Sequence, residues 1–115
     1  MDAGDLRKRT KEFAKRVIRL CRKMPNTREG RLIGDQLFRS GTSVGANYRA
    51  ACRGKSKPDF ISKLGTVLEE ADESLFWMEV ITEMEIMKPD MLGPLMDEAN
   101  QLIAIFVTSL NTAKS

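Results

Sequence analysis

Apolar residues recur every three or four positions along nearly the whole chain, which predicts a protein built from α-helices. The pattern falls into four segments, separated by short polar turns that contain proline or glycine. The apolar run 102–107 could form a short strand, but it continues a helical period. We therefore expect more than about two-thirds of the residues to be helical, and no sheet.

Residues typical of helix ends mark the first two turns. Asp5 is a candidate N-cap for the first helix, which ends at Pro25, and Thr27 is a candidate N-cap for the second. Gly54 ends the second helix, and Pro58 fits the first turn of the third.

The turn 88–90 leads into the fourth helix, and residues 112–115 at its end are expected to fray. Four helices joined by short turns pack as antiparallel neighbours. The predicted fold class is all-α, an antiparallel up-down four-helix bundle. A chain of 115 residues is long enough for one core, so residues 1–115 are expected to form a single domain.

The second helix is unusual because its interior contains glycines. Gly41 and Gly45 are four residues apart, and each costs a helix about 1 kcal/mol relative to alanine. Small residues allow another helix to approach, so we expect a tight helix–helix contact on this side. A neighbouring polar stripe follows the same spacing: Gln36, Ser40, Ser43 and Asn47. We interpret the two stripes as a packed, hydrogen-bonded interface, in which the Asn47 amide binds a carboxylate of the third helix, Glu70 or Glu73.

Two short motifs resemble those of enzymes, but their contexts do not fit. Residues 41–45 match G-x-S-x-G, yet a nucleophile elbow needs a preceding strand and a histidine partner, and the chain contains no histidine. Residues 54–56 resemble the end of a phosphate-binding loop, but Arg49 stands where that motif needs glycine. Close helix packing and a helix end are the better interpretations. We assign no catalytic residue, metal site or cofactor, and predict that the protein is not an enzyme.

The distribution of charge is the most informative feature of the composition. Residues 1–57 contain sixteen Lys and Arg against five Asp and Glu, a net charge of +11. Residues 58–115 contain three against eleven, a net charge of −8, which leaves +3 for the chain. On the first helix, like charges four residues apart repel by about 0.2–0.5 kcal/mol per pair. We expect the acidic third helix of a neighbouring subunit or a phosphate backbone to offset them, and a solvated face is the remaining alternative.

Nucleic acid is the partner that a basic first half suggests, and RNA and DNA stay equally open. Binding should be independent of sequence, because no constellation for reading bases is present. The alternative function is a protein–protein scaffold or adaptor whose charges are used in self-assembly, and the sequence names no other protein partner. The residues expected to contact nucleic acid are Arg7, Lys8, Arg9, Lys11, Lys15, Arg16, Arg19, Arg22 and Lys23, with Arg53, Lys55 and Lys57 secondary.

The remaining composition indicates an ordinary intracellular protein. Cys21 and Cys52 lie on different predicted helices without metal-ligand spacing, so we interpret them as small buried hydrophobes in a reducing compartment. A disulfide or a reactive thiol is the alternative. No run of eighteen apolar residues predicts a membrane span, and residues 1–13 lack the apolar core of a signal peptide. We expect a cytoplasmic location.

Two stretches resemble a known family. RSGTSVGANYRAA (39–51) and DFISKLGTVLEEADESLFWMEVITE (59–83) are similar to the four-helix-bundle proteins first noticed in intervening sequences of bacterial large-subunit ribosomal RNA genes. That family is related to accessory proteins of diversity-generating retroelements. The resemblance implies a small helical bundle, often a homopentamer. It also implies that some relatives act as nucleic-acid-binding accessory proteins, without an established enzymatic activity.

The third and fourth helices carry more apolar surface than one core needs. Phe76, Trp77 and Phe106 cannot all point inward if Leu75 and Met78 do. We therefore expect a homo-oligomer whose subunit contacts use the edges of these stripes, Trp77 included. The family resemblance implies that this oligomer is a homopentamer.

Overall fold

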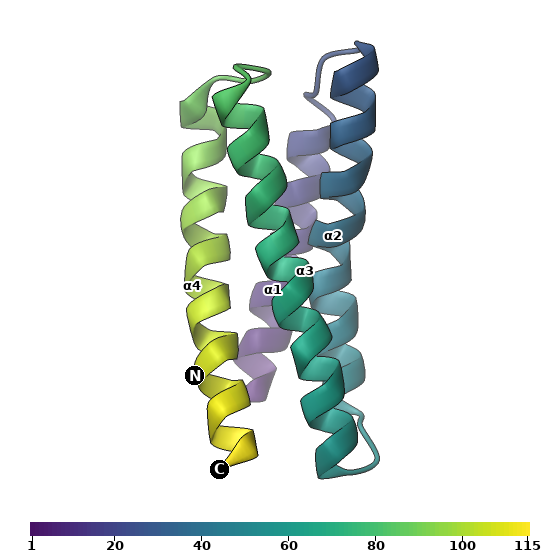
Figure 1. The fold of residues 1–115 in the computed structure, drawn as a ribbon, viewed down its shortest axis with the longest axis vertical. Coiled ribbons are helices and arrows are strands. Elements are labelled where there is room, and N and C mark those ends of the chain that lie inside the picture. The colour runs from purple at the N-terminus through teal and green to yellow at the C-terminus, as the bar shows by residue number, and fades with distance from the viewer.

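The computed structural model describes all 115 residues, which form four helices joined by short turns. These are α1 (Ala3–Cys21), α2 (Arg28–Cys52), α3 (Lys57–Glu83) and α4 (Pro89–Lys114). They contain 84% of the residues, and there is no strand. Successive helices run in opposite directions, so both termini lie at the same end of an elongated bundle (Figure 1). The predicted all-α, up-down four-helix bundle is confirmed.

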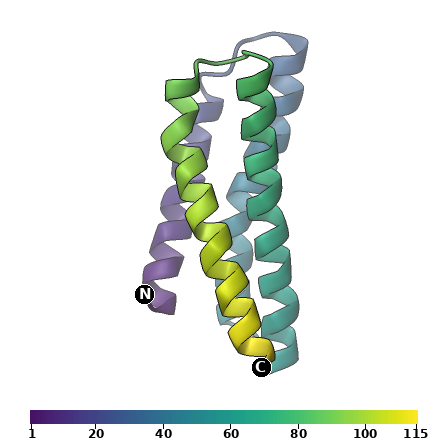
Figure 2. The same cartoon turned by 60° about the vertical axis from the view of Figure 1, so that its left-hand side comes forward.

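The four helices do not pack equally. α2 packs extensively against both α1 and α3, whereas α1 and α4 share the smallest contact. α1 is also the shortest helix, at 19 residues. Figure 2 shows the N-terminal part of α1 standing apart from the C-terminal half of α4. The α1 helix is therefore held mainly by α2.

The helix ends differ from the sequence prediction at α1 and α4. Asp2, not Asp5, is the N-cap of α1. Its carboxylate accepts from the Asp5 N–H at 2.8 Å, and the Asp5 carboxylate accepts from the Asp2 N–H at 3.2 Å. This reciprocal pair moves the start of the helix by one turn, because Asp5 occupies the N3 position of a capping box. At the other end, α4 stays helical through Lys114, so the expected fraying of residues 112–115 was wrong.

The N-caps of α2 and α3 follow local chemistry. Thr27 caps α2 as predicted, accepting from the Gly30 N–H at 3.1 Å. A Cβ at Gly30 would collide with the carbonyl oxygen of Pro25, so the tight turn excludes the Glu or Gln of a capping box there. Ser56 caps α3, which places the Gly54–Ser56 motif in a turn and at a helix start.

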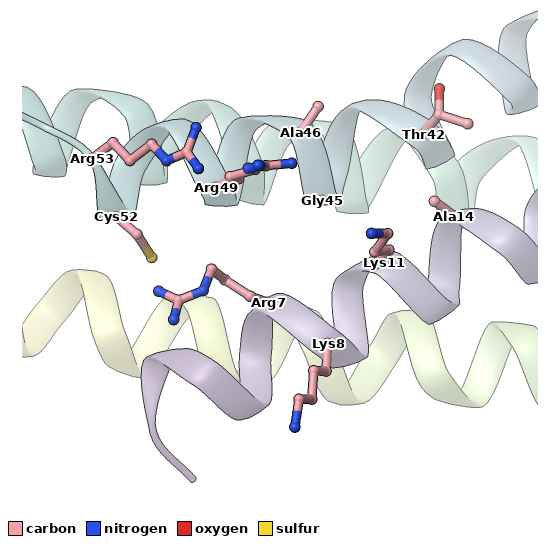
Figure 3. Close-up of a pocket in the computed structure, with 10 residues that line it drawn as sticks. All are labelled: Arg7, Lys8, Lys11, Ala14, Thr42, Gly45, Ala46, Arg49, Cys52 and Arg53. Atoms are coloured by element: carbon pink, nitrogen blue, oxygen red, sulfur yellow. The ribbon is translucent and has the colours of Figure 1, made fainter.

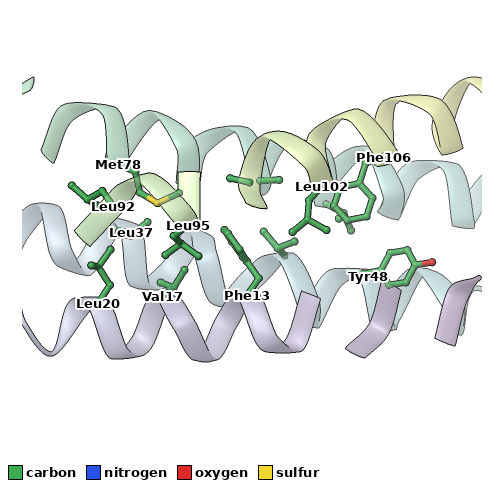
Figure 4. Packing of buried hydrophobic residues seen from close by; sticks show 14 of the residues in the cluster. Phe13, Val17, Leu20, Leu37, Tyr48, Met78, Leu92, Leu95, Leu102 and Phe106 are labelled. Atoms are coloured by element: carbon green, nitrogen blue, oxygen red, sulfur yellow. The ribbon is translucent and has the colours of Figure 1, made fainter. Parts of the chain in front are cut away.

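One core runs the length of the bundle and takes side chains from every helix (Figure 4). Phe13 of α1, Leu37 of α2, and Leu102 and Phe106 of α4 are fully buried in it. Tyr48 covers one end of the core, with its ring centroid 5.8 Å from that of Phe106. This apolar interior accounts for the helical spacing of the apolar positions.

Small residues of α2 lie at both of its helix contacts. A Cβ at Gly41 would be 2.7 Å from both γ-carbons of Val17 in α1. On the α3 side, the hydroxyl oxygens of Ser40 and Ser74 lie 3.2 Å apart, and both residues are fully buried. Each hydroxyl also bonds a carbonyl of its own helix, so neither is left unsatisfied.

The two cysteines are free thiols and only partly buried. Burial, and secondarily the negative charge of Asp35, raises the pKa of Cys21 to about 11. None of the four helices combines the length and the apolar character that crossing a membrane requires.

Candidate nucleic-acid interface

A hollow of about 620 Å³ lies between α1 and α2 near the end of the bundle that carries the termini (Figure 3). Five of its ten lining residues are basic and none is acidic. We call it the α1–α2 groove. Its basic residues are Arg7, Lys8 and Lys11 from α1 and Arg49 and Arg53 from α2. Its remaining lining is small or weakly polar: Ala14, Thr42, Gly45, Ala46 and Cys52.

The groove exists because α1 and α2 touch at a glycine and then diverge. A Cβ at Gly45 would lie 3.1 Å from the carbonyl oxygen of Thr10, so the two backbones meet here. From this point the helices separate toward Arg7 and Arg53 (Figure 3). The small side chains form the floor, and the long cationic side chains form the walls. Figure 3 also shows Lys8 directed away from α2, so four of the five cations border the space between the helices.

The charges of the groove are not neutralised by the protein. No carboxylate lies within 4.0 Å of a side-chain nitrogen of Arg7, Lys8, Lys11, Arg49 or Arg53, since the six ion pairs of the chain use other cations. Uncompensated like charges around a hollow create a local positive potential that attracts anions. The positive potential of the groove therefore favours the binding of a polyanion.

The neighbouring tyrosine does not offset this potential. Burial, and secondarily the neighbouring Cys52 thiol, raises the pKa of Tyr48 to about 12. Tyr48 is therefore neutral at ordinary pH and brings no negative charge to the groove.

Arg9 is absent from the groove although it belongs to the predicted set. Its Nε and Nη2 atoms donate to the two carboxylate oxygens of Glu98 in α4, at 2.8 and 2.7 Å, and Nη2 also donates to Gln101. The hydrogen bonds to Glu98 raise the pKa of Arg9 further. Arg9 thus fastens α1 to α4. Arg9 lies on the opposite side of α1 from Arg7, so its predicted contact with nucleic acid would not be made in the α1–α2 groove.

The middle of the basic run also lies outside the groove. Lys15 and Arg19 share the carboxylate of Glu12, at 4.0 and 3.4 Å. A second hollow, of about 230 Å³, lies between α1 and α4. It is lined by Arg16, Arg19, Leu20, Lys23, Met91, Pro94 and Leu95. The predicted basic run therefore divides between two sides of α1, because only a narrow stripe of this helix is buried.

The remaining predicted cations lie near the two ends of the bundle. Arg22 and Lys23 follow the end of α1, at the end of the bundle away from the termini (Figure 1). Lys55 lies in the α2–α3 turn, and Lys57 is the first residue of α3. All four are exposed and form no ion pair. In the same turn, Asp59 accepts from Lys63 and from the Lys55 N–H, which lowers the pKa of Asp59.

Sequence reasoning missed Arg49. The residue lies four positions after Gly45 and four before Arg53, so it shares their side of α2. That spacing was the available signal. It indicates a groove only once α1 is known to lie against this side of α2.

The predicted polar stripe lies along the α2–α3 side, but Asn47 does not bind α3. Its amide donates to the Ser43 carbonyl of its own helix at 2.8 Å, so the predicted bond to Glu70 or Glu73 was wrong. Arg39 binds both carboxylates instead, with Glu70 at 3.2 Å. The contact of Ser40 with Ser74 sets the antiparallel register, which leaves Asn47 about one turn beyond Glu70.

The other members of the stripe lie near or on the surface. The Ser43 hydroxyl donates to the Arg39 carbonyl at 2.6 Å, which places the serine of the G-x-S-x-G match in mid-helix. Gln36 is exposed, and its side chain makes no hydrogen bond within the chain. No group of three or more Asp, Glu or Cys residues is arranged to hold a metal ion.

Trp77 lies at the edge of the α2–α3 side. Its indole N–H donates to Glu73 at 3.2 Å, and the ring of Phe76 meets it edge-on at 5.0 Å. Phe76 itself is 52% exposed, and Leu32 of α2 is 55% exposed. Exposed apolar surface is therefore present on both α2 and α3.

The fold and its surface define a small all-α bundle protein with a basic groove between α1 and α2, a smaller basic hollow between α1 and α4, and exposed aromatic side chains on α3. The family described as 23S rRNA-intervening sequence protein matches residues 4–108, and the chain belongs to this family.

A solved structure supports the assignment of the fold. A protein of unknown function from the S23 ribosomal protein family of Bacteroides thetaiotaomicron VPI-5482 has a TM-score of 0.89 and is 28% identical in sequence. The similarity covers 96% of this chain and 99% of that one. Comparison with curated proteins finds no match.

Proposed function

We propose that this protein is a non-enzymatic, oligomeric bundle that binds RNA or DNA through phosphates held in the α1–α2 groove. The observation that carries the proposal is the set of five cations that line one hollow with no acidic residue in its lining. The family's name, 23S rRNA-intervening sequence protein, favours RNA. A cytoplasmic location belongs to the same proposal, and two free cysteines support a reducing compartment.

Binding through this groove should not depend on base sequence. Arginine and lysine contacts to phosphate position a nucleic acid without reading it. The groove lining contains no aromatic residue on which a base could stack, and no Asn, Gln, Asp or Glu that could pair with a base edge. Affinity should therefore follow charge and salt concentration.

A mobility-shift assay with unrelated RNA sequences tests this function. At about 50 mM salt, where screening is weak, the protein should shift all of them with similar affinity. The shift should weaken steeply toward about 200 mM salt, because each neutralised phosphate releases counterions. The proposal is wrong if no RNA or DNA shifts at the lower salt concentration.

Self-assembly completes the proposal, with a homopentamer as the expected form. Phe76 and Trp77 expose apolar surface on α3, which a subunit contact would cover. The α1–α2 groove has no residue of α3 in its lining and would stay open in such an assembly. Repeating the groove on every subunit combines weak phosphate contacts on one long strand. Light scattering at micromolar concentration tests the assembly, and a monomer rejects it.

The alternative, a scaffold whose charges serve self-assembly, is favoured by one feature of α3. Phe76 lies within an exposed acidic stripe, at helical spacing from Glu69, Asp72, Glu79 and Glu83. The α1–α4 hollow offers the complementary surface, three cations around Leu20 and Leu95. If one copy docks its stripe into this hollow of the next, raising the salt concentration should dissociate the oligomer. A scaffold would show this dissociation and no nucleic-acid shift.

A further inference from the structure

We infer that the α1–α2 groove takes the sugar–phosphate backbone of a single strand, with the bases directed to solvent, and excludes a duplex. The inference rests on the proposed function and names the form of nucleic acid that the groove accepts. Three features carry it: the length of the groove, the narrowness of its floor, and the chemistry of its lining.

The length of the groove matches a few phosphates. Its lining spans residues 7–14 of α1 and 42–53 of α2, which at 1.5 Å per residue correspond to walls of about 10 and about 16 Å. A helical strand advances about 3.4 Å along its axis per phosphate, and an extended strand advances farther, so these walls take at most about three to five phosphates. Four cations border the space between the helices, so one subunit can neutralise about as many phosphates as the groove can hold.

The floor of the groove is too narrow for a duplex. The backbones of α1 and α2 meet at Gly45 and Thr10, and packed helix axes lie about 8–10 Å apart. The major groove of B-DNA alone is about 12 Å wide, so a whole double helix cannot descend to this contact and would rest on the cationic side chains of the rim. A single backbone can enter between the walls.

The two walls then act on the same strand. Arg7 and Lys11 reach it from α1, and Arg49 and Arg53 reach it from α2 (Figure 3). Arginine binds phosphate bidentately, so cations on opposite walls can hold successive phosphates. A duplex resting on the rim would lose part of these contacts.

The lining of the groove offers contacts to the sugar–phosphate backbone of a nucleic acid rather than to its bases. Apart from the cations and the Cys52 thiol, Thr42 supplies the only polar side chain. The groove offers the bases no aromatic ring on which to stack. Removing the bases should therefore leave the affinity nearly unchanged, which separates this groove from single-strand sites that depend on stacking.

Competition against a labelled single-stranded RNA tests the inference on the full-length protein at about 50 mM salt. The competitors are single-stranded RNA, single-stranded DNA, a base-free deoxyribose–phosphate strand, and a duplex, all of equal length. The first three should compete within about three-fold of one another, since all carry the same backbone charge. The duplex should be at least about ten-fold weaker per strand length. A duplex that competes equally well, or a base-free strand that fails, overturns the inference and leaves the proposed function standing. Failure of the labelled RNA itself to bind overturns both.

A matched pair of variants locates the effect. Arg49→Gln should lower the affinity for the single strand by about five- to ten-fold, so that it approaches the affinity for the duplex. Arg49→Lys should retain most of the affinity for the single strand. The control is Arg28→Gln, an exposed cation at the start of α2 outside the groove, which should change the affinity less than about two-fold. Circular dichroism checks that both variants stay helical. Equal behaviour of Arg49→Gln and Arg28→Gln would contradict the single-strand groove.

Discussion

Gly45 of α2 packs against the backbone of Thr10 in α1, so closely that a Cβ at Gly45 would lie 3.1 Å from the Thr10 carbonyl oxygen. A backbone atom cannot move aside as a flexible side chain can. This contact therefore fixes the spacing of α1 and α2, and with it the floor of the groove between them. Gly45 therefore affects both the stability of the bundle and the shape of the proposed binding groove.

Gly45→Leu should lower the free energy of unfolding by about 1–3 kcal/mol, because the larger side chain forces the two helices apart. The control is Gly65→Leu, since a Cβ at Gly65 meets no atom within 4 Å and leucine is the better helix former. Urea denaturation measures both. Equal midpoints for the two variants would show that the glycine contact does not constrain the bundle.

Glu98→Gln should lower the free energy of unfolding by about 1–2 kcal/mol, because it removes the charge that Arg9 binds with two hydrogen bonds. This tie joins the two helices that pack least. Lys15→Gln, which removes one cation from an exposed pair with Glu12, should cost less than about 0.5 kcal/mol. Thermal denaturation measures both variants. If Lys15→Gln lowered the stability as much as Glu98→Gln, the Arg9–Glu98 pair would not be the main tie between α1 and α4.

The Ser40–Ser74 contact should appear as coupling in a double-mutant cycle. Ser40→Ala and Ser74→Ala should each cost about 0.5–1.5 kcal/mol, since each leaves the partner hydroxyl with one fewer hydrogen bond. The double variant should cost less than the sum, because no partner is then left behind. Strict additivity in urea unfolding would mean that the two hydroxyls do not interact.

The stability of the protein should fall between pH 9 and pH 11. Burial raises the pKa of Cys21 from 9.0 to about 11, so the unfolded chain loses this proton at a lower pH than the folded one. The contribution of the protonated thiol is complete below pH 9 and is lost as the pH rises through 11. Cys21→Ser, which does not ionise, should show a shallower decline in the urea midpoint from pH 8 to pH 10.5. Parallel declines for the two proteins would refute this.

The fold could be predicted from the sequence because it depends on local signals. The periodicity of three to four residues places the apolar stripes, and residues such as Thr27 and Ser56 start helices by bonding their own first turn. Even the misplaced cap at Asp5 was wrong by one turn only, since Asp2 and Asp5 form one capping box.

The groove could not be predicted because it depends on which helices stand beside α1. Arg7 and Arg9 are two residues apart, which rotates them by about 200° around the helix. Whether each arginine faces α2 or α4 depends on the handedness of the bundle. The periodicity of the apolar residues does not determine that handedness. In the structure, Arg7 lines the groove, whereas Arg9 forms an ion pair with Glu98. Arg49 was missed for the same reason, because the second wall of the groove comes from another helix.

The central claim is that nucleic acid binds in the α1–α2 groove, and not merely to the overall positive charge. Two double variants that lower the net charge equally test it by fluorescence anisotropy with a single-stranded RNA at about 50 mM salt. Arg7→Glu/Arg49→Glu places negative charge on both walls. Arg28→Glu/Arg31→Glu places it on the first turn of α2, outside the groove, where acidic residues suit the helix dipole.

The account predicts that the groove variant loses at least about ten-fold in affinity while the control loses less than about three-fold. Arg7→Gln/Arg49→Gln, which introduces no new charge, should fall between them, and circular dichroism should show all three as helical as the unmodified protein. Equal losses in the groove and control variants, or a groove variant that binds RNA as tightly as the unmodified protein, would contradict it.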